Sequence, residues 1–207
     1  MGSDMLTNTE GETAVHLVRE TIEKLLKDEE FMDPVDLDLP EIFNEKRGVF
    51  VTLTKDGLLR GCIGHPYPDS RLIHAIIDSA ISAATRDPRF PPVQPSEIAD
   101  IAIEVTVLTQ PELIDVGPEE LPEKIEIGRH GLIVKDGYCQ GLLLPQVAPE
   151  HGMDEVEFLC HTCLKAGLSS DAWKEGVEVY CFEGQIFKET APGADVVEES
   201  FEDMSCK

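Results

Sequence analysis

The stretch GVFVTLTKDGLLRGCIG, residues 48–64, decides the fold because its pattern is that of two strands joined by a tight turn. Val49, Val51 and Leu53 alternate with polar or aromatic residues, which is typical of a half-buried strand over 48–54. The KDG sequence at 55–57 supplies the turn, and residues 58–63 return as the second strand. The sequence therefore predicts a β-hairpin at the centre of the fold.

The remaining elements extend this pattern in both directions. Apolar spacing predicts helices over 9–28, from Asp69 or Ser70 to about Arg86, and over 154–166, with Thr9 and Glu12 forming a capping box for the first. Strands are expected over 101–108, 131–134 and 140–144, with one strand or a tight pair over 177–188. Because strands pair as hairpins with helices between them, we expect an α+β fold with a mainly antiparallel sheet.

Composition limits the partners and the compartment. The 207 residues carry 41 acidic and 17 basic side chains, a net charge of −24, which argues against nucleic acid and against an anionic membrane surface. No apolar run is long enough to span a bilayer, and the polar, acidic N-terminus does not resemble a signal peptide. Six scattered cysteines indicate reduced thiols, so we expect a cytoplasmic protein.

Domain organisation follows from the same patterns. We expect residues 1–8 to be disordered, residues 9–192 to form one domain, and residues 193–207 to be a frayed acidic tail. Phosphate-binding loops and metal-ligand spacings are missing from the sequence, so neither a cofactor nor a metal is predicted. The CHTC sequence at 160–163 falls inside a predicted helix, so its two cysteines are interpreted as core residues. They belong to an apolar stripe made up of Val156, Leu159, Cys160, Cys163 and Leu164.

The segment LRGCIG, residues 59–64, contains the strongest candidates for a functional site in this sequence. Strand alternation places Arg60 and Cys62 on one face, where a guanidinium favours the reactive thiolate. Gly61 and Gly64 allow a ligand or another backbone to approach closely. His65 would serve as a base if the chain folds back toward the thiol. The alternative is a strand of small residues with a buried, inert Cys62.

At this segment the sequence resembles the AMMECR family, whose signature is LRGCIG. The resemblance continues in order through nearly the whole chain, in the segments GVFVTL (48–53), DPRFPPV (87–93), IEVTVL (103–108), GRHGLI (128–133), LPQV (144–147) and KAGL (165–168). One departure is Met153, where the family often has tryptophan; it affects local packing more than membership.

The resemblance implies a two-lobed fold with the signature near a cleft between lobes, without a settled reaction. It also implies an association of relatives with Memo-like proteins and radical SAM proteins. Within the matched motifs, Glu104 is expected to pair with Arg60, Arg86 or Arg89, as a structural ion pair or as a site carboxylate.

Two further matched residues remain open to more than one interpretation. His130 is the alternative base to His65, or a turn histidine satisfied by a backbone carbonyl. Gln146 offers an oriented amide, or satisfies backbone groups of its loop.

Two functions are carried forward. The first is an enzyme that acts on a small anionic substrate, with Cys62, Glu104 and His130 as catalytic residues. The residues expected to bind that substrate are Arg60, Gly61, Gly64, His65, Arg86, Arg89 and Gln146. The second is a non-catalytic adaptor that acts with a Memo-like or radical SAM protein.

Overall fold

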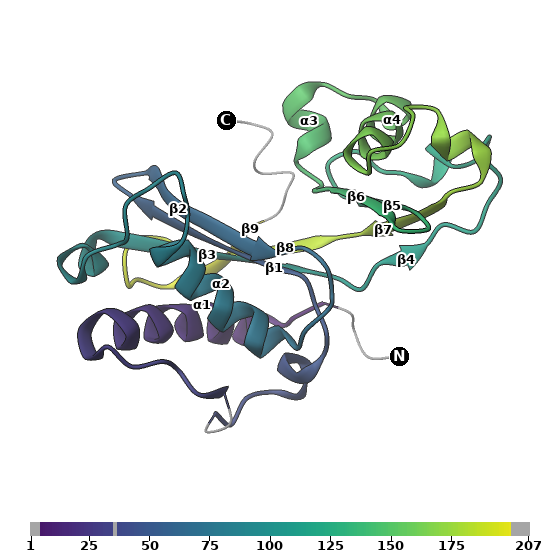
Figure 1. Ribbon diagram of the computed structural model, residues 1–207. Helices are drawn as coiled ribbons and strands as arrows, with labels where there is room; N and C mark the ends of the chain where they lie inside the picture. The colour runs from purple at the N-terminus through teal and green to yellow at the C-terminus, as the bar shows by residue number, and fades with distance from the viewer. Residues whose placement is uncertain (1–4, 35–36, 200–207) are drawn as a thin grey trace. The chain divides into compact units, whose positions relative to one another are not determined.

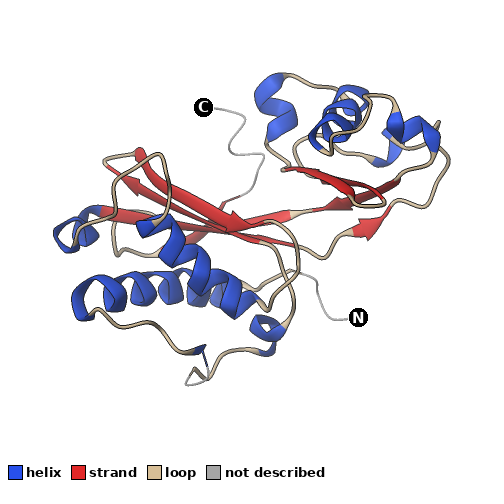
Figure 2. Ribbon diagram, in the orientation of Figure 1, coloured by secondary structure: helices blue, strands red, loops and turns tan. Residues whose placement is uncertain are grey.

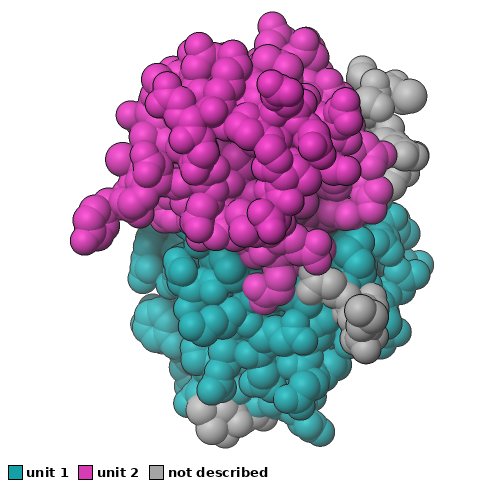
Figure 3. Space-filling model, turned by 90° about the vertical axis from the view of Figure 1, so that its right-hand side faces the viewer, with its two compact units in different colours: residues 1–108, 185–199 teal, residues 109–184, 200–207 magenta. Residues whose placement is uncertain are grey.

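The structure is a computed structural model that describes residues 5–34 and 37–199 and divides into two compact units (Figure 3). Unit 1 consists of residues 1–108 and 185–199, and unit 2 consists of residues 109–184 and 200–207. Each unit contains one sheet with helices against it (Figure 2), so the predicted two-lobed α+β fold with antiparallel sheet is confirmed.

The elements of unit 1 are, in chain order, α1 (Asn8–Glu23), the π-helical turn η1 (Lys24–Asp28), η3 (Glu41–Asn44), β1 (Val49–Lys55), β2 (Leu58–His65), α2 (Leu72–Thr85), η4 (Pro95–Asp100), β3 (Ile101–Leu108), β8 (Gly184–Glu189) and β9 (Val196–Glu199). Its five-stranded sheet has the order β2-β1-β3-β8-β9. β1 pairs antiparallel with both β2 and β3. The predicted hairpin is thus confirmed, and β2 is an edge strand.

The two faces of this sheet differ in chemistry. Helices α1 and α2 cover one face (Figure 1), where Val49, Val51 and Leu53 are fully buried. Because side chains alternate along a strand, Thr52 lies on the other face, which we call the open face of the unit 1 sheet. This face carries the candidate site described below.

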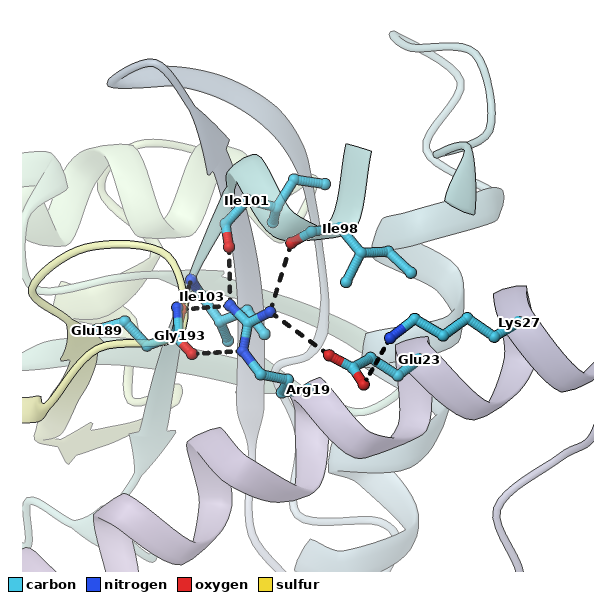
Figure 4. A network of polar contacts seen from close by, with 8 residues as sticks. All are labelled: Arg19, Glu23, Lys27, Ile98, Ile101, Ile103, Glu189 and Gly193. Carbon is cyan, nitrogen blue, oxygen red and sulfur yellow. Dashed lines mark hydrogen bonds and ion pairs between the residues drawn. The ribbon is translucent and has the colours of Figure 1, made fainter. Parts of the chain in front are cut away.

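A buried ion pair fixes α1 to the sheet (Figure 4). The Arg19 guanidinium donates to both carboxylate oxygens of Glu189 at 2.7 and 2.6 Å and also to the carbonyl oxygen of Ile101. The Glu189 side chain is only 1% exposed and accepts a further bond from the backbone N–H of Ile103. Every charged atom in the network therefore has a partner, which is the condition under which a buried ion pair is tolerated.

Unit 2 contains β4 (Glu112–Leu113), η5 (Pro122–Lys124), β5 (Gly131–Asp136), β6 (Cys139–Leu143), α3 (Val147–His151), α4 (Glu155–Lys165), η6 (Ala172–Glu175) and β7 (Glu178–Phe182). Its sheet has the order β4-β7-β5-β6. Phe158, Leu159 and Trp173 pack with strand residues Leu132 and Val134 in its core.

Helix α4 only partly matches its predicted apolar stripe. Leu159 and Cys163 are buried and Cys160 packs partly against the core, as expected for the CHTC segment. Val156 and Leu164, expected in the same stripe, are exposed instead. The core side of α4 is formed by its 158–159 and 162–163 pairs, so the buried face is rotated from the predicted one.

Other predicted boundaries are wrong. The capping box at the start of α1 uses Thr7 and Glu10, two residues before the predicted Thr9 and Glu12, and the residue before this cap, Leu6, is buried. Leu6 and Thr7 therefore belong to the ordered structure, while residues 1–4 lie outside the described part. Neither Asp69 nor Ser70 caps α2, whose N-cap is Arg71 without a side-chain bond.

The segments near the C-terminus also depart from expectation. One strand or a tight pair is predicted over 177–188. The structure has two strands there, β7 and β8, which do not pair with each other because they belong to different sheets and different units. The expected frayed tail contains β9, which pairs antiparallel with β8. Residues 200–207 of that tail lie outside the described residues.

Candidate functional site

Arg60 lies at a β-bulge in the signature strand. Leu59 pairs with Thr54 and Gly61 pairs with Leu53, so Arg60 is an extra residue with no partner opposite it on β1. Such a bulge interrupts the alternation of side chains. The two-residue spacing alone therefore does not place Arg60 and Cys62 on one face, and that part of the expectation stays a prediction.

The Arg60 guanidinium makes a structural contact with the segment that precedes β3. Its Nε and Nη2 donate to the Glu97 carboxylate at 3.2 and 3.0 Å, and its Nη1 donates to the Pro91 carbonyl at 2.9 Å. The hydrogen-bonded guanidinium lowers the pKa of Glu97 to about 2. All three guanidinium nitrogens donate hydrogen bonds to protein groups, so Arg60 connects β2 to the loop after α2.

Cys62 is held at the sheet edge by the motif that follows α2. Its backbone N–H donates to Asp87 Oδ2 at 2.9 Å, and its carbonyl accepts from Arg89 Nη2 at 3.2 Å. Its Sγ accepts a hydrogen bond from the Thr52 hydroxyl at 3.4 Å. Because Cys62 and Thr52 are cross-strand partners, the thiol lies on the open face of the sheet.

Arg89 is the cation beside Cys62. Its Nε and Nη2 donate to the two carboxylate oxygens of Asp87 at 3.0 and 2.7 Å, while the Arg89 side chain stays 53% exposed. Bonding to Asp87 raises the pKa of Arg89, with a smaller contribution from Cys62. Among the described residues its Nη1 has no hydrogen-bond partner, so one edge of a fixed guanidinium is available to an anion.

Asp87 organises this corner of the site. Its side chain is almost completely buried and accepts bonds from Arg89 and from the backbone N–H of Cys62. The hydrogen-bonded guanidinium holds the pKa of the Asp87 carboxyl far below its usual range. Asp87 therefore stays ionised throughout the neutral range.

The signature glycines accommodate protein rather than ligand. A Cβ on Gly61 would lie 2.2 Å from the carbonyl oxygen of Ala83 in α2, and one on Gly64 would lie 2.4 Å from the Phe50 ring. The sequence predicts that these glycines allow close approach of either a ligand or another part of the backbone. The atoms that approach them closely in the structure belong to the chain itself.

His65 and Arg86 belong to a separate surface cluster. His65 is the cross-strand partner of Val49, so it lies on the helix-facing side, opposite to Cys62. Its Nε2 is 2.7 Å from Asp78 on α2, and Arg86 is 3.7 Å from the same carboxylate. The structure does not bring His65 to the thiol.

Glu104 is on the same face as Cys62, across one strand. Thr52 pairs with Cys62 on β2 and with Glu104 on β3, which gives a row of three side chains over the open face. The expected pairing of Glu104 with an arginine is wrong, since Arg60, Arg86 and Arg89 bind other carboxylates. Burial raises the pKa of Glu104.

His130 and Gln146 belong to unit 2, whereas the other predicted site residues belong to unit 1. The backbone N–H of Glu126 donates to His130 Nδ1 at 3.1 Å, so this histidine closes its own turn by accepting rather than by donating. Arg129 binds Glu126 and Glu183, both at 2.9 Å. The Gln146 Oε1 is buried at the start of α3 and has no hydrogen-bond partner among the described residues.

The described residues contain neither a cluster of metal-ligating side chains nor a membrane-spanning helix. In residues 5–34 and 37–199, no group of three or more His, Cys, Asp or Glu side chains is arranged to hold a metal ion. No helix in the same residues is long and apolar enough to cross a membrane.

Fold and site together define the class: an α+β protein in which an edge strand, a loop after the second helix and a row of polar side chains surround one thiol. Comparison with known proteins identifies the family. The AMMECR1 family model matches residues 15–187, and the chain belongs to that family.

Relatives match over nearly their full length. The chain is 67% identical over 199 residues to a protein of Methanosarcina barkeri, covering 95% of this chain and 98% of that protein. It is 52% identical over 199 residues to a protein of Methanocaldococcus jannaschii, covering 94% and 98%. A crystal structure of an uncharacterized protein from Pyrococcus horikoshii matches with a TM-score of 0.79 at 47% identity, covering 94% of this chain and 98% of that one.

Sequence reasoning missed Thr52 and Asp87. Thr52 was interpreted only as the polar side of a strand, although its position opposite the cysteine in the hairpin was available as a signal. Asp87 was interpreted as a helix-ending residue before Pro88. Its position in the DPRF segment beside an edge strand could not be obtained without the three-dimensional fold.

Proposed function

We propose that the protein is an enzyme whose nucleophile is Cys62, acting at the open face of the unit 1 sheet. The observation that carries this proposal is that the Thr52 hydroxyl donates to Cys62 Sγ while the Arg89 guanidinium donates to the carbonyl oxygen of the same residue. A hydroxyl and a guanidinium thus lie beside one thiol, an arrangement typical of cysteines that react as nucleophiles.

Arg89 also supports a small anionic substrate. Asp87 fixes the guanidinium through Nε and Nη2, so an anion binding at Nη1 does not have to immobilise a flexible side chain. The other motif arginines offer less, because Arg60 uses all three nitrogens on protein groups. We therefore assign substrate recognition to Arg89 in place of Arg60.

The cellular setting fits a thiol-based reaction. The five cysteines in the described residues are all free, which suits the reducing cytoplasm in which we place the protein.

The test is the rate of alkylation of each cysteine at pH 6, resolved by peptide mass spectrometry. Cys139 is exposed and serves as the internal reference thiol. We expect iodoacetamide to modify Cys62 at least about tenfold faster than Cys139, and iodoacetate to be preferred over iodoacetamide at Cys62 only. Arg89→Met should remove that preference. Equal rates at Cys62 and Cys139 would show that Cys62 is not an activated nucleophile.

One observation favours the adaptor alternative. Leu58 and Leu59, the last residue before the signature segment and its first, are 73% and 42% exposed at the start of β2. An apolar pair next to a sheet edge suits a protein partner, such as the Memo-like or radical SAM protein implied by the resemblance. Under this alternative Cys62→Ser leaves partner capture intact and Leu58→Asp abolishes it.

A further inference from the structure

Glu104 has the placement of a second reacting group. It lies on β3, directly across Thr52 from Cys62, and these three side chains share the open face of one sheet. Its carboxylate is partly buried, and no hydrogen bond or ion pair connects it to any of the residues that the structure describes. A partly buried carboxyl without a partner costs stability, and such costs are concentrated at functional sites.

The charged groups around Glu104 do not neutralise it. Lys188 on β8 is the cation that acts on Glu104, and its ammonium forms an ion pair with Glu199 on β9. Glu199 acts on Glu104 as a like charge. With burial as the largest cause, the pKa of Glu104 is raised, so the protonated form of this carboxyl persists closer to neutral pH than in an exposed glutamate.

The strand spacing sets the size of the molecule that fits between the two groups. Two strand intervals separate β2 from β3, which amounts to roughly 9–10 Å. A reacting carbon about 3–3.5 Å from sulfur and a hydrogen bond of about 2.6–3.2 Å to the carboxyl together take roughly 6–7 Å. The remaining span corresponds to a few bonded atoms.

We propose that Glu104 is a catalytic proton donor for the Cys62 site and that the site takes small carbonyl compounds, including conjugated ones. This inference rests on the proposed function, because it requires Cys62 to act as the nucleophile. In a conjugated carbonyl compound the electrophilic carbon lies three bonds from the oxygen, which matches the remaining span better than the single bond of a simple carbonyl.

The step balances with the groups present. The Cys62 thiolate forms a bond to the electrophilic carbon, and a π electron pair moves to the carbonyl oxygen. Glu104 gives its proton to that oxygen and becomes a carboxylate, which regains a proton from water. No oxidant or reductant is needed.

The experiment compares two electrophiles of similar size on the full chain at pH 6. Acrylamide needs a proton on its oxygen or carbon as sulfur adds, whereas iodoacetamide loses iodide and needs none. For Glu104→Gln we expect at least a tenfold slower reaction of Cys62 with acrylamide and less than a twofold change with iodoacetamide. Glu198→Gln is the matched control, since Glu198 pairs with Phe187 on the helix-facing side of the same sheet, and it should change neither rate.

Each outcome has a distinct meaning. If wild-type Cys62 reacts slowly with iodoacetamide, the proposed function fails. If wild-type Cys62 reacts quickly but Glu104→Gln leaves the acrylamide rate unchanged, or slows both reagents equally, the proton-donor role is wrong while the nucleophile stands. Urea unfolding checks the fold: Glu104→Gln should match wild type near pH 4 and be more stable at pH 8, because a raised pKa in the folded state costs wild type stability as pH rises.

Discussion

Replacing Asp87 by asparagine should remove the charge that fixes both the edge of β2 and the guanidinium of Arg89. The buried carboxylate accepts the Cys62 backbone N–H at 2.9 Å and pairs with Arg89 at 3.0 and 2.7 Å. A hydrogen bond to a charged group contributes about 1.5–3 kcal/mol, and a neutral one about half as much. Asparagine retains an acceptor for Cys62 but turns an N–H₂ group toward Arg89.

We expect Asp87→Asn to lose about 2–3 kcal/mol of unfolding free energy at pH 7, with the Arg89 share discounted because that side chain is half exposed. For a chain of this length that loss corresponds to roughly 5–10 °C in Tm. The same variant should slow alkylation of Cys62, because Arg89 is no longer held beside the thiol.

The pH dependence provides the sharper test. The pKa of Asp87 is depressed in the folded state, so its contribution is complete above the ordinary carboxyl pKa of about 4 and is lost as pH falls toward the folded value. The difference between wild type and Asp87→Asn should be constant from pH 7 to 5 and smaller at pH 2.5. Asp78→Asn, at a half-exposed carboxylate on α2, is the control and should cost less than about 0.5 kcal/mol. A loss at Asp87 that does not shrink in acid would refute the charge argument.

Two further predictions concern packing. Gly61→Ala would drive a methyl group into the backbone of α2 and should cost at least about 1–3 kcal/mol in urea unfolding; Gly117→Ala, which meets nothing within 4 Å, should be nearly neutral. Arg19→Ala leaves the buried Glu189 carboxylate uncompensated and should cost about 3–5 kcal/mol, measured in the same assay. Losses below about 1 kcal/mol at either position would contradict the packing described.

Local pattern was enough to predict the strands of the central hairpin. Alternation of Val49, Val51 and Leu53 determined which face of β1 is buried, and the same two-residue period located β3 at 101–108. Apolar spacing also located α2 and α4, because each presents several consecutive turns to a core. The capping box at α1 was misplaced because Thr7–Glu10 and Thr9–Glu12 fit the same pattern, and only the burial of Leu6 selects between them.

The partners of the site residues could not be predicted in this way. A bulge adds one residue to one strand, and no composition signal at Arg60 indicates it. Cys62 is bonded to Asp87, 25 residues later, and the cation that acts on Glu104 is Lys188, on a strand that follows unit 2 in the sequence. Such pairings depend on how segments that are distant in the sequence pack together. An arginine that is close in the sequence therefore does not indicate which residue a cysteine or carboxylate contacts.

The contacts around Cys62 connect the stability of the fold to its chemistry. An edge strand presents unpaired backbone groups that favour pairing with another chain, and proteins protect such edges with loops and charges. Here Asp87 and Arg89 occupy the outward N–H and C=O of Cys62, which blocks a neighbouring strand at this point of β2. Because they bind its backbone from the side, the Cys62 side chain is left on the open face, with Thr52 as its contact. The same protection therefore positions a guanidinium next to the thiol, and mutations of Asp87 should affect stability and reactivity together, whereas those of Glu104 should separate them.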